Sequence, residues 1–204
     1  MAVELAGVVA VPGAPAPGTL PQIVFSGRSN VGKSSLINRF LGRTRKPVAR
    51  VSATPGKTQQ INFYRVQAEA AGGRKREFYV VDLPGYGFAR VPESVRAAWR
   101  PLIERYLSGT RHIAGVVQLV DIRHEPTPDD RRMLEYLAAL RLPVLVALTK
   151  ADKLGASMRA ARRAELAAAL RLPVDQLVAF SAVTGEGRAE LLGGVDALLA
   201  EPVR

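Results

Sequence analysis

Residues 22–38 read QIVFSGRSNVGKSSLIN and decide the fold: an apolar run ends in a glycine-bounded turn, and apolar residues at helical spacing follow. The segment from Gly27 to Ser34 has the spacing of a phosphate-binding loop between a strand and a helix. Glycine lets successive backbone N–H groups approach phosphate oxygens, and the start of the helix adds its positive dipole end. We therefore expect Lys33 to reach the β- and γ-phosphates of a nucleotide and Ser34 to ligate magnesium.

Apolar runs of strand length recur along the rest of the chain and alternate with segments of helical periodicity. Strands are predicted over residues 22–26, 61–66, 77–81, 115–120, 143–148 and 177–181, and helices over 36–41, 92–107, 133–140, 166–170 and 191–199. This alternation predicts an α/β fold, a three-layer P-loop NTPase domain with a mostly parallel six-stranded sheet and helices on both faces. Residues 21–204 are predicted to form this single domain, and residues 1–20, interrupted by Pro12, Pro15 and Pro17, a loosely attached amino-terminal arm.

The composition excludes several classes of chemistry. The 204 residues include no cysteine, which excludes disulfides, thiolate metal sites and thiol catalysis. They include only two histidines, His112 and His124, which we assign to surface or turn positions. No apolar run approaches the roughly 18 residues that span a bilayer, and the amino terminus carries no cationic leader, so we expect a cytoplasmic protein without a membrane partner.

The formal net charge of +11 is concentrated in one quarter of the chain. Residues 28–76 carry twelve basic residues against one acid, Glu69, and the remainder of the chain is balanced. Two interpretations of this stretch remain open: a solvated basic face, or a surface that meets an anionic partner such as nucleic acid. Composition alone does not decide between them.

The identity of the base is indicated by Thr149-Lys150-Ala151-Asp152, which follows an apolar strand. A carboxylate at Asp152 can accept hydrogen bonds from the N1–H and the 2-amino group of guanine, a pair that adenine does not offer. The stem of Lys150 can lie over the base. Ser181-Ala182 follows the last predicted strand, where a backbone N–H can contact the guanine O6. GTP and GDP are therefore the expected ligands.

Two further segments are expected near the γ-phosphate and the metal. Asp82-Leu83-Pro84-Gly85 ends a strand, which places Asp82 to hold a magnesium-bound water and the Gly85 N–H to sense the γ-phosphate. Thr54-Pro55-Gly56-Lys57-Thr58-Gln59 lies in a long basic loop. We choose Thr58 over Thr54 to complete the magnesium shell, because it lies nearer the following strand. GTP is expected to order residues 43–60 and 84–91, and hydrolysis to release both.

In this order, these elements resemble the translation-factor-like GTPases, and most closely the EngB/YihA family of bacterial ribosome-biogenesis GTP-binding proteins. The most family-specific string is Asp82-Leu83-Pro84-Gly85-Tyr86-Gly87-Phe88-Ala89, and the likeness covers about residues 20–200. The resemblance implies a magnesium-dependent GTPase that helps to assemble the large ribosomal subunit and is linked to cell division and septation. One departure is Val183-Thr184-Gly185-Glu186-Gly187, where the family usually carries a lysine-rich segment.

The predicted site is large. Catalysis is assigned to Lys33, Thr58 and Gly85, and magnesium to Ser34 and Thr58 directly and to Asp82 through water. The predicted contacts with GTP are Gly27, Arg28, Ser29, Asn30, Val31, Gly32, Lys33, Ser34, Ser35, Gly56, Lys57, Thr58, Asp82, Leu83, Pro84, Gly85, Thr149, Lys150, Asp152, Ser181 and Ala182.

The expected turnover is slow. Tyr86 stands where many GTPases place the glutamine that orients the attacking water, and a phenol cannot donate and accept toward water as an amide does. Arg90 stays open as an internal arginine finger. Asn30 is a candidate potassium residue, since similar GTPases with asparagine at this loop position bind that ion. We expect a monomer stimulated by a partner or by potassium, which meets rRNA of the large subunit through residues 28–76. The alternative is a nucleotide-gated scaffold for division proteins in which hydrolysis is incidental.

Overall fold

The computed structural model describes residues 1–49, 60–69, 73, 75–86 and 93–201, the side chains of 93–99 excepted. Its strands are β1 (Ala2–Val9), β2 (Gln22–Gly27), β3 (Ile61–Glu69), β4 (Lys75–Asp82), β5 (Ile113–Asp121), β6 (Val144–Thr149) and β7 (Leu177–Ala179). Its helices are α1 (Lys33–Phe40), α2 (Glu93–Gly109), α3 (Pro128–Ala139), α4 (Ala156–Leu170) and α5 (Arg188–Ala200), with short 3-10 turns at Ala151–Lys153 and Val174–Gln176. The six predicted strands and five predicted helices are all present.

The strands form one sheet in the order β1-β3-β4-β2-β5-β6-β7. The five strands from β4 to β7 in that order are parallel, whereas β3 pairs antiparallel with β4 and β1 antiparallel with β3. Because parallel strands point the same way, the carboxyl ends of β4, β2, β5, β6 and β7 meet at one edge of the sheet. Every predicted nucleotide-binding segment in the described part follows one of these strand ends.

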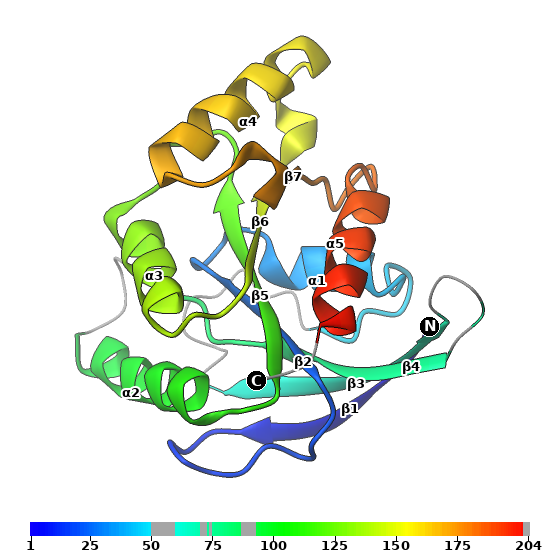
Figure 1. Ribbon diagram of the computed structural model, residues 1–204, viewed down its shortest axis with the longest axis vertical. Coiled ribbons are helices and arrows are strands. Elements are labelled where there is room, and N and C mark those ends of the chain that lie inside the picture. The colour runs from blue at the N-terminus through cyan, green and yellow to red at the C-terminus, as the bar shows by residue number, and fades with distance from the viewer. Residues whose placement is uncertain (50–59, 70–72, 74, 87–92, 202–204) are drawn as a thin grey trace.

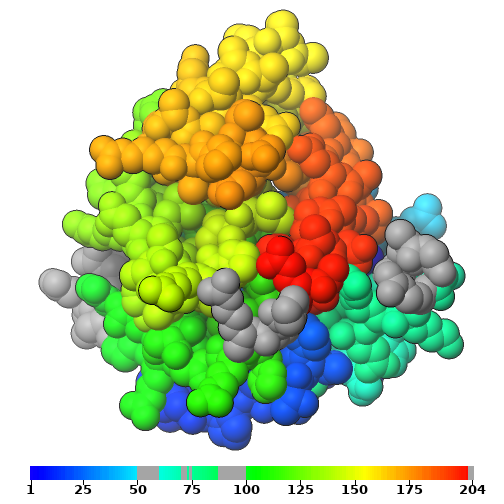
Figure 2. Space-filling model, in the orientation of Figure 1, coloured from blue at the N-terminus to red at the C-terminus, as the bar shows by residue number. Residues whose placement is uncertain are grey.

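The amino terminus corrects one expectation. Residues 1–20 are not a loosely attached arm in their first half, because Ala2–Val9 is a seventh strand at the edge of the sheet, paired from Ala2↔Gln67 to Val9↔Ile61. Its outer positions are exposed, Leu5 at 59%, and only Val9 is buried. The strand is thus held mainly by its backbone ladder rather than by an apolar face, which is why the apolar pattern alone did not reveal it. In Figures 1 and 2 it lies, in blue, at the lower edge of the molecule.

Helices cover both faces of the sheet (Figure 1). On one face α1 and α5 pack Leu36, Ile37, Phe40 and Leu191 against alternate sheet residues such as Phe25. On the other face α2 and α3 cover Val24 and its neighbours, and α4 packs against β5, β6 and β7. Successive residues of β2 therefore point into different cores, as the alternation of strand side chains requires. No helix in the described part is long and apolar enough to cross a membrane.

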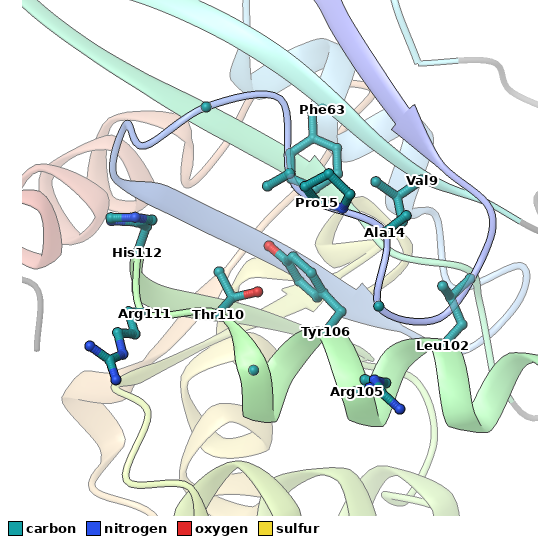
Figure 3. Close-up of a pocket in the computed structure, with 14 residues that line it drawn as sticks. Val9, Ala14, Pro15, Phe63, Leu102, Arg105, Tyr106, Thr110, Arg111 and His112 are labelled. Atoms are coloured by element: carbon teal, nitrogen blue, oxygen red, sulfur yellow. The ribbon is translucent and has the colours of Figure 1, made fainter.

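A cavity of about 510 Å³ lies at the opposite edge of the sheet from the parallel strand ends. It lies between the 13–18 segment, α2 and β3, with Tyr106 pointing into it beside Pro15 and Phe63 (Figure 3). The Tyr106 hydroxyl donates a 2.6 Å hydrogen bond to Gln22 at the beginning of β2. None of the residues predicted to bind nucleotide lines this cavity, so its size does not identify it as the nucleotide site.

Candidate guanine-nucleotide site

The phosphate-binding loop connects β2 to α1 as predicted. Gly32 caps α1 with φ 99°, a left-handed conformation that favours glycine, and no side chain caps the helix. The first N–H groups of α1 have no acceptor within the helix, so they face the loop as donors for an anion. Asn30 is also left-handed, with φ 62°. This backbone geometry suits phosphate oxygens at the amino-terminal end of an eight-residue helix.

Lys33 and Asp82 meet at the bottom of this loop. Asp82 ends β4 opposite Phe25 of β2, and its carboxylate is in direct contact with the Lys33 ammonium group. Both residues are buried, Lys33 at 9% and Asp82 at 3% exposure. Lys33 is the only hydrogen-bond partner of the Asp82 carboxylate among the described residues, so one of its oxygens is left to accept from a metal-bound water. With the hydroxyl of Ser34 close by in sequence, the donor set fits Mg²⁺, which prefers oxygen ligands and retains water.

The segment after Asp82 packs directly on the phosphate-binding loop. The Ser29 N–H donates to the Tyr86 carbonyl at 2.9 Å, and Arg28 and Tyr86 form an isolated parallel bridge. Gly85 lies against Ser29 so closely that a Cβ there would be 2.8 Å from the Ser29 Oγ and 3.2 Å from the Ser29 N. Close approach of the two segments therefore favours glycine at position 85.

The Tyr86 side chain is anchored away from the loop. Its hydroxyl donates to the Asp130 carboxylate at 2.9 Å and accepts from the Gln118 amide, which links Gly85 to β5 and α3. Burial, together with the neighbouring Asp130 carboxylate, raises the pKa of the Tyr86 phenol well above its ordinary value, so it remains a hydrogen-bond donor. Asp130 lies in the first turn of α3 and closes a capping box with Thr127. No local motif signals its second role as the partner of Tyr86.

Thr149 and Lys150 tie the base-recognition segment to the phosphate-binding loop. The Thr149 hydroxyl donates to the Val31 carbonyl at 2.7 Å, and the Lys150 ammonium to the Asn30 carbonyl at 3.0 Å. Lys150 also pairs with Asp121 at 2.9 Å. Burial raises the pKa of Asp121, but hydrogen bonds from Arg123 and Lys150 outweigh it and hold that pKa well below its usual range. Asp121 at the end of β5 is thus a positioning residue that sequence inspection missed.

Asp152 and Ser181 lie side by side at the expected base site. The Ser181 hydroxyl donates to the Asp152 carboxylate at 2.7 Å, and this hydrogen bond, the largest cause, lowers the pKa of Asp152. An ionised carboxylate can accept from both donors of guanine. A cavity of about 240 Å³ lies here, lined by Gly32, Ser35, Leu36, Thr149, Lys150, Asp152, Lys153, Phe180, Ala182 and Val183. Residues from the phosphate-binding loop, the Thr149–Asp152 segment and the Ser181–Ala182 segment therefore enclose one space.

Comparison with known proteins places this arrangement in a family. The family described as "50S ribosome-binding GTPase" matches residues 22–150. A relative named "Probable GTP-binding protein EngB", from Gemmatimonas aurantiaca, is 50% identical over 184 residues, which are 90% of this chain and 85% of the relative. The chain belongs to the EngB family of GTP-binding proteins.

Other members are similarly close. The protein of the same name from Geobacter sulfurreducens is 46% identical over 185 residues, 91% of this chain and 85% of the relative. A crystal structure of a "probable GTP-binding protein engB" superposes with a TM-score of 0.69 at 27% identity, covering 89% of this chain and all of that one. The fold is thus that of a P-loop GTPase G domain, with a seventh strand beyond the six expected.

Several predicted residues cannot be placed. Gly56, Lys57, Thr58 and Arg90 lie outside the described residues. The structure brings together the phosphate-binding loop, Asp82 to Gly85, Thr149 to Asp152 and Ser181 to Ala182 at one edge of the sheet. Among the histidines, His124 is exposed and His112 is half-buried beside the distant cavity, and neither lies among residues that could hold a metal ion in the described part.

Proposed function

We propose that this EngB-family chain is a slow, magnesium-dependent GTPase that acts in the cytoplasm as a nucleotide switch in assembly of the large ribosomal subunit. The meeting of Lys33 and Asp82 beneath uncapped helix amides carries the catalytic half of the proposal. Bound Mg²⁺ would neutralise developing phosphate charge, held by Ser34, by Thr58 and, through water, by Asp82. Lys33 would leave Asp82 to contact the β- and γ-phosphates, and the Gly85 N–H would meet the terminal phosphate.

Base recognition has a test that inverts specificity. Asp152 accepts two hydrogen bonds in the proposed site, whereas xanthine carries an oxygen in place of the 2-amino group of guanine. Asp152→Asn should therefore lose affinity for GDP and gain affinity for the xanthine nucleotide XDP, measured by displacement of a fluorescent GDP analogue. An Asp175→Asn variant, an exposed acid away from this cavity, is the matched control. Equal weakening of GDP and XDP would contradict the assigned role.

The ribosomal half of the proposal is supported by the family's description and by unpaired charge. Arg45 and Lys46 are exposed and make no ion pair with any described residue, and the Arg43 guanidinium donates to the Met1 carbonyl at 3.3 Å and pairs with no described carboxylate. In contrast, the α4 arginines are neutralised by neighbouring acids, as in the pairs Arg159–Glu186 and Arg163–Glu190. These cations follow α1 and lie within residues 43–60, the first of the two segments that GTP is proposed to order, where they are suited to rRNA phosphates.

Charge removal at matched sites tests this surface. Changing Arg43, Arg45 and Lys46 together to glutamine should weaken binding to large subunits. The slope of log affinity against log salt concentration should also become shallower, by the equivalent of up to about three phosphate contacts. The control changes Arg132, Arg141 and Arg171, which are exposed cations at other sites, to glutamine and removes the same charge. Equal weakening of ribosome binding by both triple variants would show that Arg43, Arg45 and Lys46 contribute only non-specific attraction.

The switch rate forms the last part of the proposal. Tyr86 engages Asp130 and Gln118, so its hydroxyl does not replace a water-orienting glutamine. Hydrolysis should then depend on charge supplied by a partner or by potassium. The Asn30 side chain makes no hydrogen bond with the described residues, which leaves its oxygen for such an ion. Equal GTP turnover in sodium and potassium buffers would eliminate the potassium role.

A further inference from the structure

The loop after β7 is fastened to α1 by an arginine. From the last turn of α1, the Arg39 Nε donates to the Ala182 carbonyl at 2.7 Å and its Nη2 to the Val183 carbonyl at 2.5 Å. The two carbonyls belong to the loop that begins at Ser181, whose hydroxyl donates to Asp152, and Ala182 and Val183 line the base cavity together with Asp152. Gly185, further along this loop, lies beside the same side chain, since a Cβ at position 185 would be 3.8 Å from the Arg39 Cδ.

A second arginine makes the reciprocal contact. Arg188, the first residue of α5, donates from Nε to the Arg39 carbonyl at 2.9 Å and from Nη2 to the Phe40 carbonyl at 3.0 Å. These carbonyls end α1, where the Arg39 carbonyl also accepts the Gly42 N–H at 3.1 Å, and the negative end of the helix dipole attracts the cation. Neither guanidinium is ion-paired with a carboxylate among the described residues, so both are used on backbone carbonyls.

The consequence is a mechanical link between the two halves of the nucleotide site. The first turn of α1 carries Lys33 and Ser34, which would face the phosphates in the proposed site, and its last turn carries Arg39. Since α1 is only eight residues long, about 12 Å, it connects the phosphate site to the base-recognition loop through a short, regular helix. The carbonyl that Arg39 holds and the N–H that would meet the guanine O6 belong to the same residue, Ala182.

We propose that Arg39 is a positioning residue for guanine recognition, holding the Ser181–Val183 loop at the depth where its backbone N–H meets O6. This inference rests on the proposed nucleotide site and concerns only how that site reads the base. Arg39 itself does not touch the nucleotide. Its loss should therefore affect ligands according to whether they carry O6, and not according to their phosphates.

Three diphosphates separate the contacts. GDP and IDP both carry O6, but IDP lacks the 2-amino group that Asp152 accepts, and ADP lacks both. Arg39→Met, which retains the apolar stem, should weaken GDP and IDP by the same factor of about ten and leave ADP unchanged. Arg39→Lys, with a charge but no fork, should recover part of the loss. Affinities are read by competition against a fluorescent GDP analogue, up to millimolar ADP.

Controls keep the result specific. Arg163→Met removes an α4 arginine that donates to the Val174 carbonyl at 3.1 Å and should leave all three affinities unchanged. Thermal unfolding of each variant shows that it is folded, and Arg39→Lys supplies the answer where Arg39→Met does not fold. An unchanged ratio of GDP affinity to ADP affinity in the Arg39 variants, whether neither nucleotide or both are weakened, would overturn the inference. A wild-type chain that binds GDP no better than ADP would overturn the proposed function itself, and the inference with it.

Discussion

Deleting the hydroxyl group of Tyr86 tests how Gly85 and Tyr86, which follow β4, are held against the phosphate-binding loop. In Tyr86→Phe the Gln118 amide loses an acceptor and the Asp130 carboxylate loses a donor, at residues that are 0% and 3% exposed. The second oxygen of Asp130 keeps its bonds from the Thr127 N–H and hydroxyl at 2.9 and 2.7 Å. The loss of hydrogen bonding is therefore partial, and we expect the variant to lose about 2–3 kcal/mol of its unfolding free energy. For a chain of this length that lowers Tm by roughly 4–12 °C.

The functional effect should be selective for the triphosphate. Tyr86 holds the neighbouring Gly85 against Ser29, and only a γ-phosphate would meet the Gly85 N–H. We expect Tyr86→Phe to weaken a non-hydrolysable GTP analogue by about fivefold relative to GDP, or about 1 kcal/mol. Fluorescence competition measures both affinities.

The chain supplies a matched control. The Tyr106 hydroxyl is also hydrogen-bonded to a buried glutamine, Gln22 at 2.6 Å, but at the opposite edge of the sheet. Tyr106→Phe should lower Tm without changing the ratio of the two nucleotide affinities. If Tyr86→Phe leaves that ratio unchanged as well, or if both variants change it equally, the anchoring role of Tyr86 is refuted.

Two further predictions concern the base-recognition segments. Thr149→Val removes the 2.7 Å hydrogen bond to the Val31 carbonyl and should weaken GDP and the GTP analogue alike, by about five- to thirtyfold, in the fluorescence competition assay; Thr110→Val, beside the distant cavity, should change neither. The pKa of Asp152 is lowered chiefly by Ser181. GDP affinity should therefore stay constant as the pH falls and should decrease only when the pH is below the ordinary carboxyl range. Ser181→Ala removes that cause, so the acid loss of GDP affinity should begin at higher pH, and an unmoved acid limb in a pH titration of GDP affinity would contradict the assignment.

Most of the site could be predicted because its parts are local motifs at strand ends. Each predicted segment indicates its chemistry within eight residues or fewer, as in Gly27 to Ser34, Asp82 to Gly85 and Thr149 to Asp152. A parallel sheet then brings the strand ends that carry them together. The same rule predicts Ser181 near the expected base, and in the structure its hydroxyl donates to the Asp152 carboxylate.

The residues that escaped prediction act through contacts between distant parts of the chain. Arg39 and Val183 are separated by 144 positions, and Tyr86 and Asp130 by 44, and no periodicity encodes such pairs. Asp130 lies in the first turn of α3, and its bond to Tyr86 depends on how α3 packs beside β5. The edge strand Ala2–Val9 escaped for a related reason, because its ladder to β3 spans more than 50 residues and leaves its side chains largely exposed.

Control of attachment to the large ribosomal subunit by nucleotide state is the centre of the proposed function. Co-sedimentation with separated subunits, in GDP and in a non-hydrolysable GTP analogue at two salt concentrations, tests it most directly. We predict binding to the large subunit in the GTP-like state only, weakening steeply with salt. Equal binding in both nucleotide states, or none in either, would contradict it.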